Sequence, residues 1–386
     1  ILEEQITKTV LQARQKVSAL EADLKKLQGQ KEKKDTAKIE ETQKQIAQIK
    51  KDTPHFESPF AVGVQDASLY VVADGAHKTK LDYKPNQAQD LAIHIRGNPN
   101  NTGPQAPRKF MEVLSSPASK PFTKGSGRLE LAESLFKDSK PLVARVIVNR
   151  VWKQHFDRGI VETPSDFGIM GEKPSHPELL DDLAARFIAN GWSMKWLHKE
   201  IILSAAYRQQ SGTTSEKDPE NRFLARMPRK RLDVEAWRDS MLAVAGNLDS
   251  TVGGPPLDLG LATNHRRTIY GTVKRRELND LLRLHDFPDP ITHSPNRIPT
   301  TTPLQQLYTL NSPFVHSQAD ALVKRLKAAY PSDERLQITE AYALLFGRKP
   351  TDEQLKLGME FLQTAGNNWQ QYAQALLASN EFLFID

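Results

Sequence analysis

The sequence predicts a mainly helical α+β protein, in which a helical body with a small N-terminal β-sheet follows a helical coiled-coil hairpin arm. Three observations predict this class. Residues 1–52 contain no proline and no aromatic residue, and they mix charged with apolar positions. Residues 56–97 contain short runs of β-branched and aromatic residues. Beyond Leu129, apolar residues recur at the spacing of amphipathic helices.

The arm is predicted from a narrow apolar seam. Apolar or small residues step by three and four along residues 10–27, as in a coiled coil, and the seam fails at residues 29–35. A second apolar stripe follows over residues 39–49. Two antiparallel helices are therefore the preferred interpretation, and one long helix is the alternative. In either case we expect residues 1–52 to bind a protein partner or to self-associate.

The region after the arm is predicted to be β-rich. Strand-like runs occur at residues 60–64, 68–73 and 91–97, and turn-forming residues separate them. Residues 98–127 are rich in Pro, Asn, Ser and Gly, which is typical of a long surface loop. One further strand-like run is predicted at residues 267–273.

These changes of pattern divide the chain into three parts. The arm spans residues 1–52, a small β-rich subdomain with the long loop spans 53–128, and the mainly helical body spans 129–386. We expect residues 53–386 to form one compact unit.

The composition is that of a globular protein. Of the 386 residues, 38% are hydrophobic and 26% are charged, which disfavours a disordered or fibrous chain. No stretch approaches the ~20 apolar residues of a transmembrane helix. The chain has no cysteine, which excludes disulfides, thiolate metal sites, covalent c-type haem and cysteine nucleophiles within it. The net charge of +6 is small, and no nucleic-acid-binding motif accompanies it, so nucleic acid is not an expected partner.

The densest group of polar and aromatic residues lies between residues 149 and 176. His155, Asp166 and His176 are candidates for acid–base catalysis, because an imidazole and a carboxylate can exchange protons near neutral pH. The preferred interpretation is structural. Trp152 and Phe156 are predicted to be core residues, Asp166 to cap its own turn, and His176 to cap the helix that begins at Pro177.

Two arginine-rich clusters, residues 222–231 and 265–276, suit anionic groups because guanidinium forks match carboxylates, sulfates and phosphates. An ion-pair network with acidic neighbours such as Asp233, Glu235 and Asp239 is the preferred alternative. With one residue from the polar stretch, the candidate ligand-binding residues are Arg158, Arg231, Arg266, Arg267, Tyr270 and Arg275.

Asp286 and Asp289 lie in the proline-broken loop HDFPDP and are the remaining candidates for a metal site or for paired glycosidase carboxylates. Turn formation is the preferred interpretation, so no metal site is predicted. The local motifs of serine hydrolases, HExxH metalloproteases, P-loop proteins and EF-hands are absent from the sequence.

Several segments together resemble a known family. The sequence AIHIRGNPNNTGPQAPRKFMEVL begins at residue 92, and a long composite motif containing DFGIMGEKPSHPELLDDLAARF occupies residues 144–211. LFGRKPTDEQ and ALLASNEFLFID follow in the family's order. Over roughly residues 60–386 the chain resembles the planctomycete-specific domain of unknown function that closes large secreted proteins.

This resemblance implies context and no mechanism. Such proteins often carry, upstream, a cytochrome c domain with a Cys-x-x-Cys-His haem site, and they are exported. The resemblance therefore implies a periplasmic, cell-surface or extracellular location. Because this chain has no cysteine, the resemblance implies a haem only in an upstream domain, and no cofactor is expected in this chain. The family supplies no catalytic residues.

The function predicted first is a non-catalytic structural or binding module of an exported, surface-associated multidomain protein. It would contact an anionic polysaccharide or partner subunits. The alternative is a polysaccharide-active hydrolase, in which Asp166 and His176 perform acid–base chemistry while Arg158 and Arg231 orient anionic groups.

Overall fold

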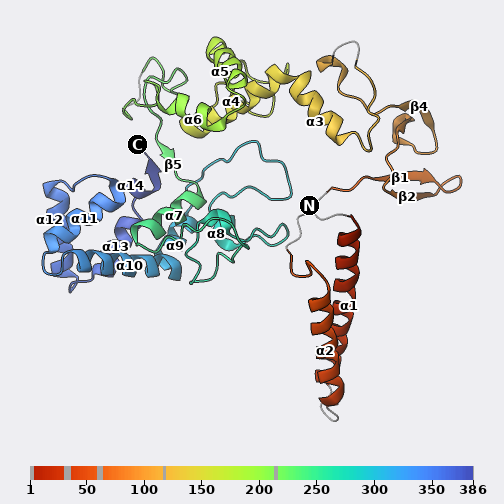
Figure 1. Cartoon of the computed structure of the whole chain (residues 1–386). Helices are drawn as coiled ribbons and strands as arrows, with labels where there is room; N and C mark the ends of the chain where they lie inside the picture. The colour runs from red at the N-terminus through yellow and green to blue at the C-terminus, as the bar shows by residue number, and fades with distance from the viewer. Residues whose placement is uncertain (1–3, 30–35, 59–63, 116–118, 213–215, 386) are drawn as a thin grey trace. The chain divides into compact units, whose positions relative to one another are not determined.

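The computed structural model describes residues 4–29, 36–58, 64–115, 119–212 and 216–385 (Figure 1). Within these residues the structure is mainly helical, and the strands form short antiparallel pairs, which confirms the predicted α+β class. The chain divides into two compact units. One comprises Ile1–Lys109 and Lys120–Glu130, and the other comprises Phe110–Ser119 and Leu131–Asp386.

The arm is a hairpin of two helices, α1 (Glu4–Gly29) and α2 (Thr36–Asp52), as Figure 1 shows. The hairpin interpretation is thus confirmed over the single-helix alternative. Among the described residues of the arm, Ala13, Val17, Ile46 and Phe56 form a small buried cluster, with Leu20, Leu24 and Ile49 partly buried against it. Arg14 donates hydrogen bonds to the carbonyls of Phe56 and Ser58, which fixes the chain that leaves α2. The hairpin therefore uses its own apolar seam internally.

Two separate β-ribbons follow where one small sheet was predicted. β1 (Ala67–Ala73) pairs with β2 (Thr79–Pro85), and β3 (Leu91–His94) pairs with β4 (Thr102–Ala106). The strand predicted at 60–64 falls on residues 60–63, outside the described residues, and on Val64, which is not in a strand.

The predicted long loop at residues 98–127 is partly wrong. It contains β4 and a 3-10 turn, Glu112–Leu114. The sequence TGPQA lacks the β-branched and aromatic residues that signal a strand, apart from Thr102. Its pairing is set by the tight turn after β3, where Gly97 adopts a positive φ of 73°.

The first part of the body is built on α3 (Arg128–Lys137), α4 (Lys140–Phe156), α5 (Pro177–Ala189) and α6 (Met194–Ile202). α4, α5 and α6 bury their apolar faces in one core, in which Val148, Phe187 and Leu197 are fully enclosed. Ser193 is the N-cap residue of α6, and its hydroxyl accepts a hydrogen bond from the Trp196 amide. Serine is one of the residues preferred at this position, because its side chain satisfies a free amide of the first helical turn.

The second part begins with β5 (Lys230–Arg231) and α7 (Val234–Val244), and it ends with β6 (Phe384–Ile385), which pairs with β5. Its core centres on Trp237, Leu322 and Ile338. Thr302 and Thr351 start their helices with capping boxes. Between β5 and β6 lie α7, α8 (Asp280–Leu284), α9 (Pro303–Asn311), α10 (Pro313–Ala329), α11 (Glu334–Phe346), α12 (Asp352–Thr364), α13 (Trp369–Leu377) and α14 (Asn380–Leu383).

The strand predicted at residues 267–273 is wrong. The segment forms a 3-10 turn, Thr268–Tyr270, and a single bridge at Gly271, while a second bridge, at Arg266, lies just before it. The reason lies in α7, where Asp239 accepts hydrogen bonds from both the backbone amide and the hydroxyl of Thr268. The backbone amide of Thr268 thereby bonds to a side chain of α7, so it is not available to donate to a neighbouring strand.

Candidate functional site

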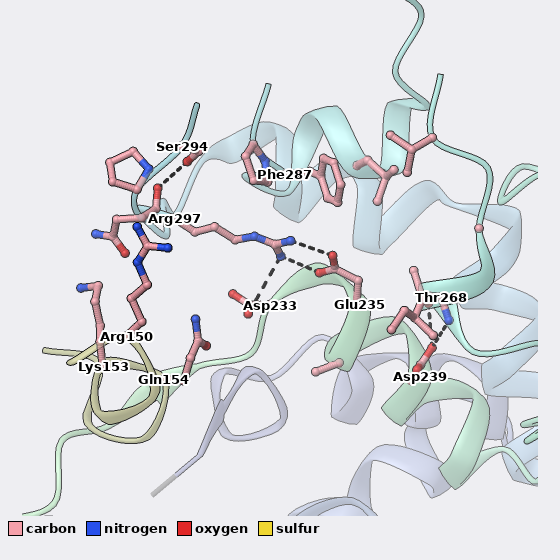
Figure 2. Close-up of a pocket in the computed structure, with 18 of the residues that line it drawn as sticks. Arg150, Lys153, Gln154, Asp233, Glu235, Asp239, Thr268, Phe287, Ser294 and Arg297 are labelled. Atoms are coloured by element: carbon pink, nitrogen blue, oxygen red, sulfur yellow. Dashed lines mark hydrogen bonds and ion pairs between the residues drawn. The ribbon is translucent and has the colours of Figure 1, made fainter. Parts of the chain in front are cut away.

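The candidate site is a hollow of about 770 Å³ in the body. Its wall comes from the C-terminal half of α4, the start of α7, the segment that includes the 3-10 turn, and the loop after α8. In Figure 2, Arg150, Lys153 and Gln154 lie on one side, Glu235 and Asp239 on the other, and Arg297 between them. A hollow of this size accommodates a drug-sized ligand or a few sugar units.

One side of the hollow is cationic, and we call Arg150, Lys153 and Lys230 the cationic wall. Arg150 and Lys153 share a face of α4 because they are three residues apart, and Val148, Val151 and Trp152 take the buried face. Lys153 donates to the carbonyl of Asp157 at 3.0 Å, and Lys230 donates to the carbonyl of Gln154. In the described part of the chain, no carboxylate forms an ion pair with any of the three.

The opposite side is built on a bidentate ion pair. The Arg297 guanidinium donates to both carboxylate oxygens of Glu235, at 2.7 and 2.9 Å. Burial raises the pKa of the Glu235 carboxyl, but the hydrogen bonds from Arg297 and the backbone outweigh this, so the pKa lies below its ordinary value of 4.5. Arg297 also lies over the Phe287 ring, 5.0 Å from its centroid. The pair fixes the loop after α8 to the start of α7.

The 3-10 turn at Thr268–Tyr270 is held from two sides. Arg238 of α7 is fully buried and donates to the Arg266 carbonyl and the Thr268 hydroxyl, both at 3.1 Å. Asp239 accepts from Thr268 at 2.7 Å and pairs with Arg267 at 3.4 Å. This part of the wall is therefore rigidly bonded to the helix behind it.

Two carboxylates of the hollow are held much less closely. Asp233 has one ion pair, a long one of 3.9 Å to Arg297, and 46% of its side chain is exposed. It occupies the N-cap position of α7 without making a capping hydrogen bond. Asp157, the exposed left-handed residue that ends α4, forms no ion pair with any described residue. Together with the cationic wall, these carboxylates can contact a ligand.

The part of the chain that contains the hollow matches a known protein family. Residues 127–362 match the model of the family described as "PSD1: Protein of unknown function (DUF1553)". The match covers more than half of the chain. The chain belongs to the DUF1553 family. All residues that line the hollow, from Arg150 to Arg297, lie in the segment that matches the DUF1553 model. No curated protein and no solved structure matches the chain.

The three predicted catalytic residues of this DUF1553 chain do not line the hollow. Asp166 accepts a hydrogen bond from the Gly168 amide at 2.9 Å, which confirms the predicted turn cap. His176 occupies the N-cap position of α5, but its side chain does not cap. It bonds to the Ser175 hydroxyl at 3.0 Å, so the predicted capping role is wrong. A proline at N1 removes one amide that a cap would serve.

His155 forms a hydrogen bond with a second histidine. Its Nε2 lies 2.8 Å from Nδ1 of His198, which joins α4 to α6. Burial, then His198, then Lys230 lower the pKa of His155. Trp152 and Phe156, its neighbours on α4, are buried and stack at 4.4 Å, as predicted for core residues.

Of the predicted ligand-binding residues, Arg267 alone lines the hollow. Arg158 pairs with Glu162 at 2.8 Å and donates to the Glu220 carbonyl. Arg231 donates to Gln305 at 3.0 Å and lies 3.7 Å from Asp286. These arginines therefore have internal partners.

The remaining members of the arginine-rich clusters behave differently from one another. Arg266 donates to the carbonyls of Thr251, Gly253 and Pro255, and its guanidinium lies over the Tyr270 ring at 4.4 Å. One face of Tyr270 is thus covered by the chain itself. Arg275 is exposed on the loop that follows.

Asp286 and Asp289 stabilise their loop. Asp286 accepts from the amide and hydroxyl of Thr300, and Asp289 caps the amide of Ile291 at 2.9 Å. Among the residues that the structure describes, no group of three or more His, Asp or Glu side chains could hold a metal ion. Likewise, none of the described helices is both long and apolar enough to cross a bilayer.

The sequence reasoning missed most of the site. Lys153, Lys230 and Arg297 were not among the candidates, and Asp233 and Glu235 appeared only as neutralising neighbours. One signal was present: Arg150, Lys153 and Asp157 repeat a charged face on a helix whose other face is apolar. For Arg297 there was no signal, because its role depends on a loop that returns to α7 from 62 residues away.

Proposed function

We propose that the body is a non-catalytic binding module that takes an anionic polysaccharide in the hollow. The observation that carries this proposal is the cationic wall, where Arg150, Lys153 and Lys230 have no ion-pair partner in the described chain. Cations without an internal carboxylate can neutralise the acidic groups of a ligand through charge-assisted hydrogen bonds. The protein is further proposed to be exported, on the strength of its resemblance to a secreted family.

The rest of the wall suits a sugar. Sugar hydroxyl groups find hydrogen-bond acceptors and donors in Asp233, Gln154 and Asn296, and the exposed Ile269 offers apolar surface to the ring. The hydrolase alternative is less well supported, because Asp166 and His176 have local partners and do not line the hollow.

Binding of the full chain to polygalacturonate, with neutral dextran for comparison, tests the proposal. We expect binding to polygalacturonate that weakens with salt, and no binding to dextran. The double variant R150A/K153A should lose at least about tenfold in affinity, since a single charge-assisted hydrogen bond contributes ~1.5–3 kcal/mol and ~1.4 kcal/mol corresponds to a factor of ten.

The matched control is K140A/R145A, which removes the same charge from the same helix. Lys140 and Arg145 do not line the hollow, and Arg145 pairs with Asp181 instead. Equal losses in the two double variants, or wild-type affinity in R150A/K153A, would refute the proposed site.

The arm is proposed to mediate assembly. Its seam is buried within the hairpin, and its surface carries charges such as Lys50 and Glu21, which pair across the two helices at 3.3 Å. A partner would therefore meet a mainly polar surface. Light scattering after gel filtration should give a smaller assembly for a chain lacking residues 1–52, with an unchanged far-UV spectrum per residue for the body. An identical oligomeric state would reject this role.

A further inference from the structure

Charges of both signs line the hollow, and they bear on which anionic ligand fits it. Glu235 and Asp239 are neutralised by Arg297 and Arg267. Asp157 and Asp233 are not closely neutralised, yet they line the same hollow as the cationic wall. A ligand in the hollow therefore meets three available cations and two available carboxylates.

We infer that the hollow selects a polysaccharide of low charge density, with one carboxylate on each sugar and free neighbouring hydroxyls, over a densely sulfated one. This inference rests on the proposed function and deepens it. A uronate unit places its single carboxylate on the cationic wall and donates hydroxyl hydrogen bonds to Asp233 and Asp157. A polymer with sulfates in place of those hydroxyls has no donor for the two carboxylates and is repelled by them.

The position of Asp233 makes it the better probe of the two carboxylates. It lies beside Arg297 at the start of α7, it is half exposed, and its side chain makes no capping hydrogen bond to the helix. The bond that Asp233 does give to α7 comes from its backbone carbonyl, which accepts from the Trp237 amide, and a side-chain replacement leaves that bond in place. Replacement of Asp233 by asparagine keeps the size and an acceptor oxygen while it removes the charge. We therefore expect the D233N chain to fold normally.

The test compares affinities for polygalacturonate and dextran sulfate at the same ionic strength, by calorimetry on the full chain. The wild type should prefer polygalacturonate. D233N should bind dextran sulfate about two- to fivefold more tightly while it gains less for polygalacturonate, as expected for the loss of one solvent-exposed like-charge contact. The control is D320N, which removes an exposed carboxylate of α10 outside the hollow.

The outcomes separate the two proposals. Failure of the wild type to bind either polymer refutes the proposed function and the inference with it. Binding of both polymers with a preference for dextran sulfate overturns the inference alone. The inference is also overturned if D233N and D320N shift the two affinities by the same factors.

Discussion

Two neighbouring regions of the body differ in whether their polar side chains have partners within the protein. In the loop between α4 and α5, residues 158–176, Arg158 and Asp166 are bonded to groups of nearby segments. In the hollow, the cationic wall and Asp233 lack close partners of opposite charge in the described chain. Both regions are rich in polar residues, so composition alone does not separate a region that holds the fold from one that can bind a ligand.

The partners of each group make the difference. A polar group that is satisfied internally contributes to stability and has little left to offer a ligand. A cation held by a single carbonyl keeps donors available at its exposed end, as Lys153 and Lys230 do. The loop should therefore respond to substitution through stability, and the hollow through binding.

The largest effect is expected at Asn149, which connects α4 to the loop. Its amide accepts from the Val161 amide at 2.8 Å and donates to the Val161 carbonyl at 2.9 Å, with no exposure to solvent. The packing is close, because a Cβ at Gly159 would collide with both groups. N149A should lower the free energy of unfolding by about 2–4 kcal/mol, since two buried backbone groups lose their partner.

Urea unfolding of the full chain measures this loss, and N190A is the matched control. Asn190 donates from an exposed position to the Arg186 carbonyl, so its replacement should cost under about 1 kcal/mol. Equal losses in N149A and N190A would contradict this prediction, because the loop would then not depend on its buried hydrogen bonds to Asn149.

A smaller effect of about 1 kcal/mol is expected for E235Q in the hollow. The folded protein binds the Glu235 proton more weakly than the unfolded chain, because the pKa is lowered from 4.5. The stabilisation from the Arg297 pair is thus complete above pH 4.5 and is lost as the pH falls through the lowered pKa of the folded state. Thermal unfolding of wild type and E235Q should differ near neutral pH and converge in acid. A constant difference across this range would contradict the assignment.

His155 connects the two regions, because it bonds to the partly buried His198 of α6 and lies near Lys230 of the hollow. H198N should raise the pKa of His155, since it removes one of the causes that lower it, although burial keeps the pKa below 6.5. Titration of the His155 ring by NMR measures the shift. H316N, at a histidine that bonds to the Leu310 carbonyl, should leave it unchanged. If the pKa of His155 is unaltered in H198N, then His198 is not one of the groups that lower it.

The smallest effects are expected for D166N and H176N. The asparagine oxygen at residue 166 can still accept from the Gly168 amide, and the His176 side chain does not cap α5. We expect changes in stability of about 0.5 kcal/mol or less and unaltered affinity for polygalacturonate. A loss of turnover on a polysaccharide that the wild-type chain degrades would instead establish the hydrolase alternative at these residues.

Local patterns made part of the structure predictable. The three- and four-residue steps of the arm, the core positions of Trp152 and Phe156, and the turn at Asp166 each depend on residues close in sequence. The predicted strand at 267–273 was wrong because two side chains of α7, about thirty residues earlier, bond to Thr268. Asp239 accepts from its backbone amide, and Arg238 donates to its hydroxyl. The hollow could not be predicted for the same reason. It requires α4, α7 and the loop at Arg297 to meet, and no local spacing records that meeting.

A crystal structure of the full chain with a bound galacturonate oligomer tests most directly whether the cationic wall binds the ligand while the 158–176 loop holds the fold. The cationic wall has no ion-pair partner in the described part of the chain, although Lys153 and Lys230 each donate to one backbone carbonyl. We expect ligand carboxylates within hydrogen-bonding distance of Arg150, Lys153 or Lys230, with the internal hydrogen bonds of the loop unchanged. An oligomer seated instead on Arg158, Asp166 or His176, with their internal hydrogen bonds broken, would contradict it.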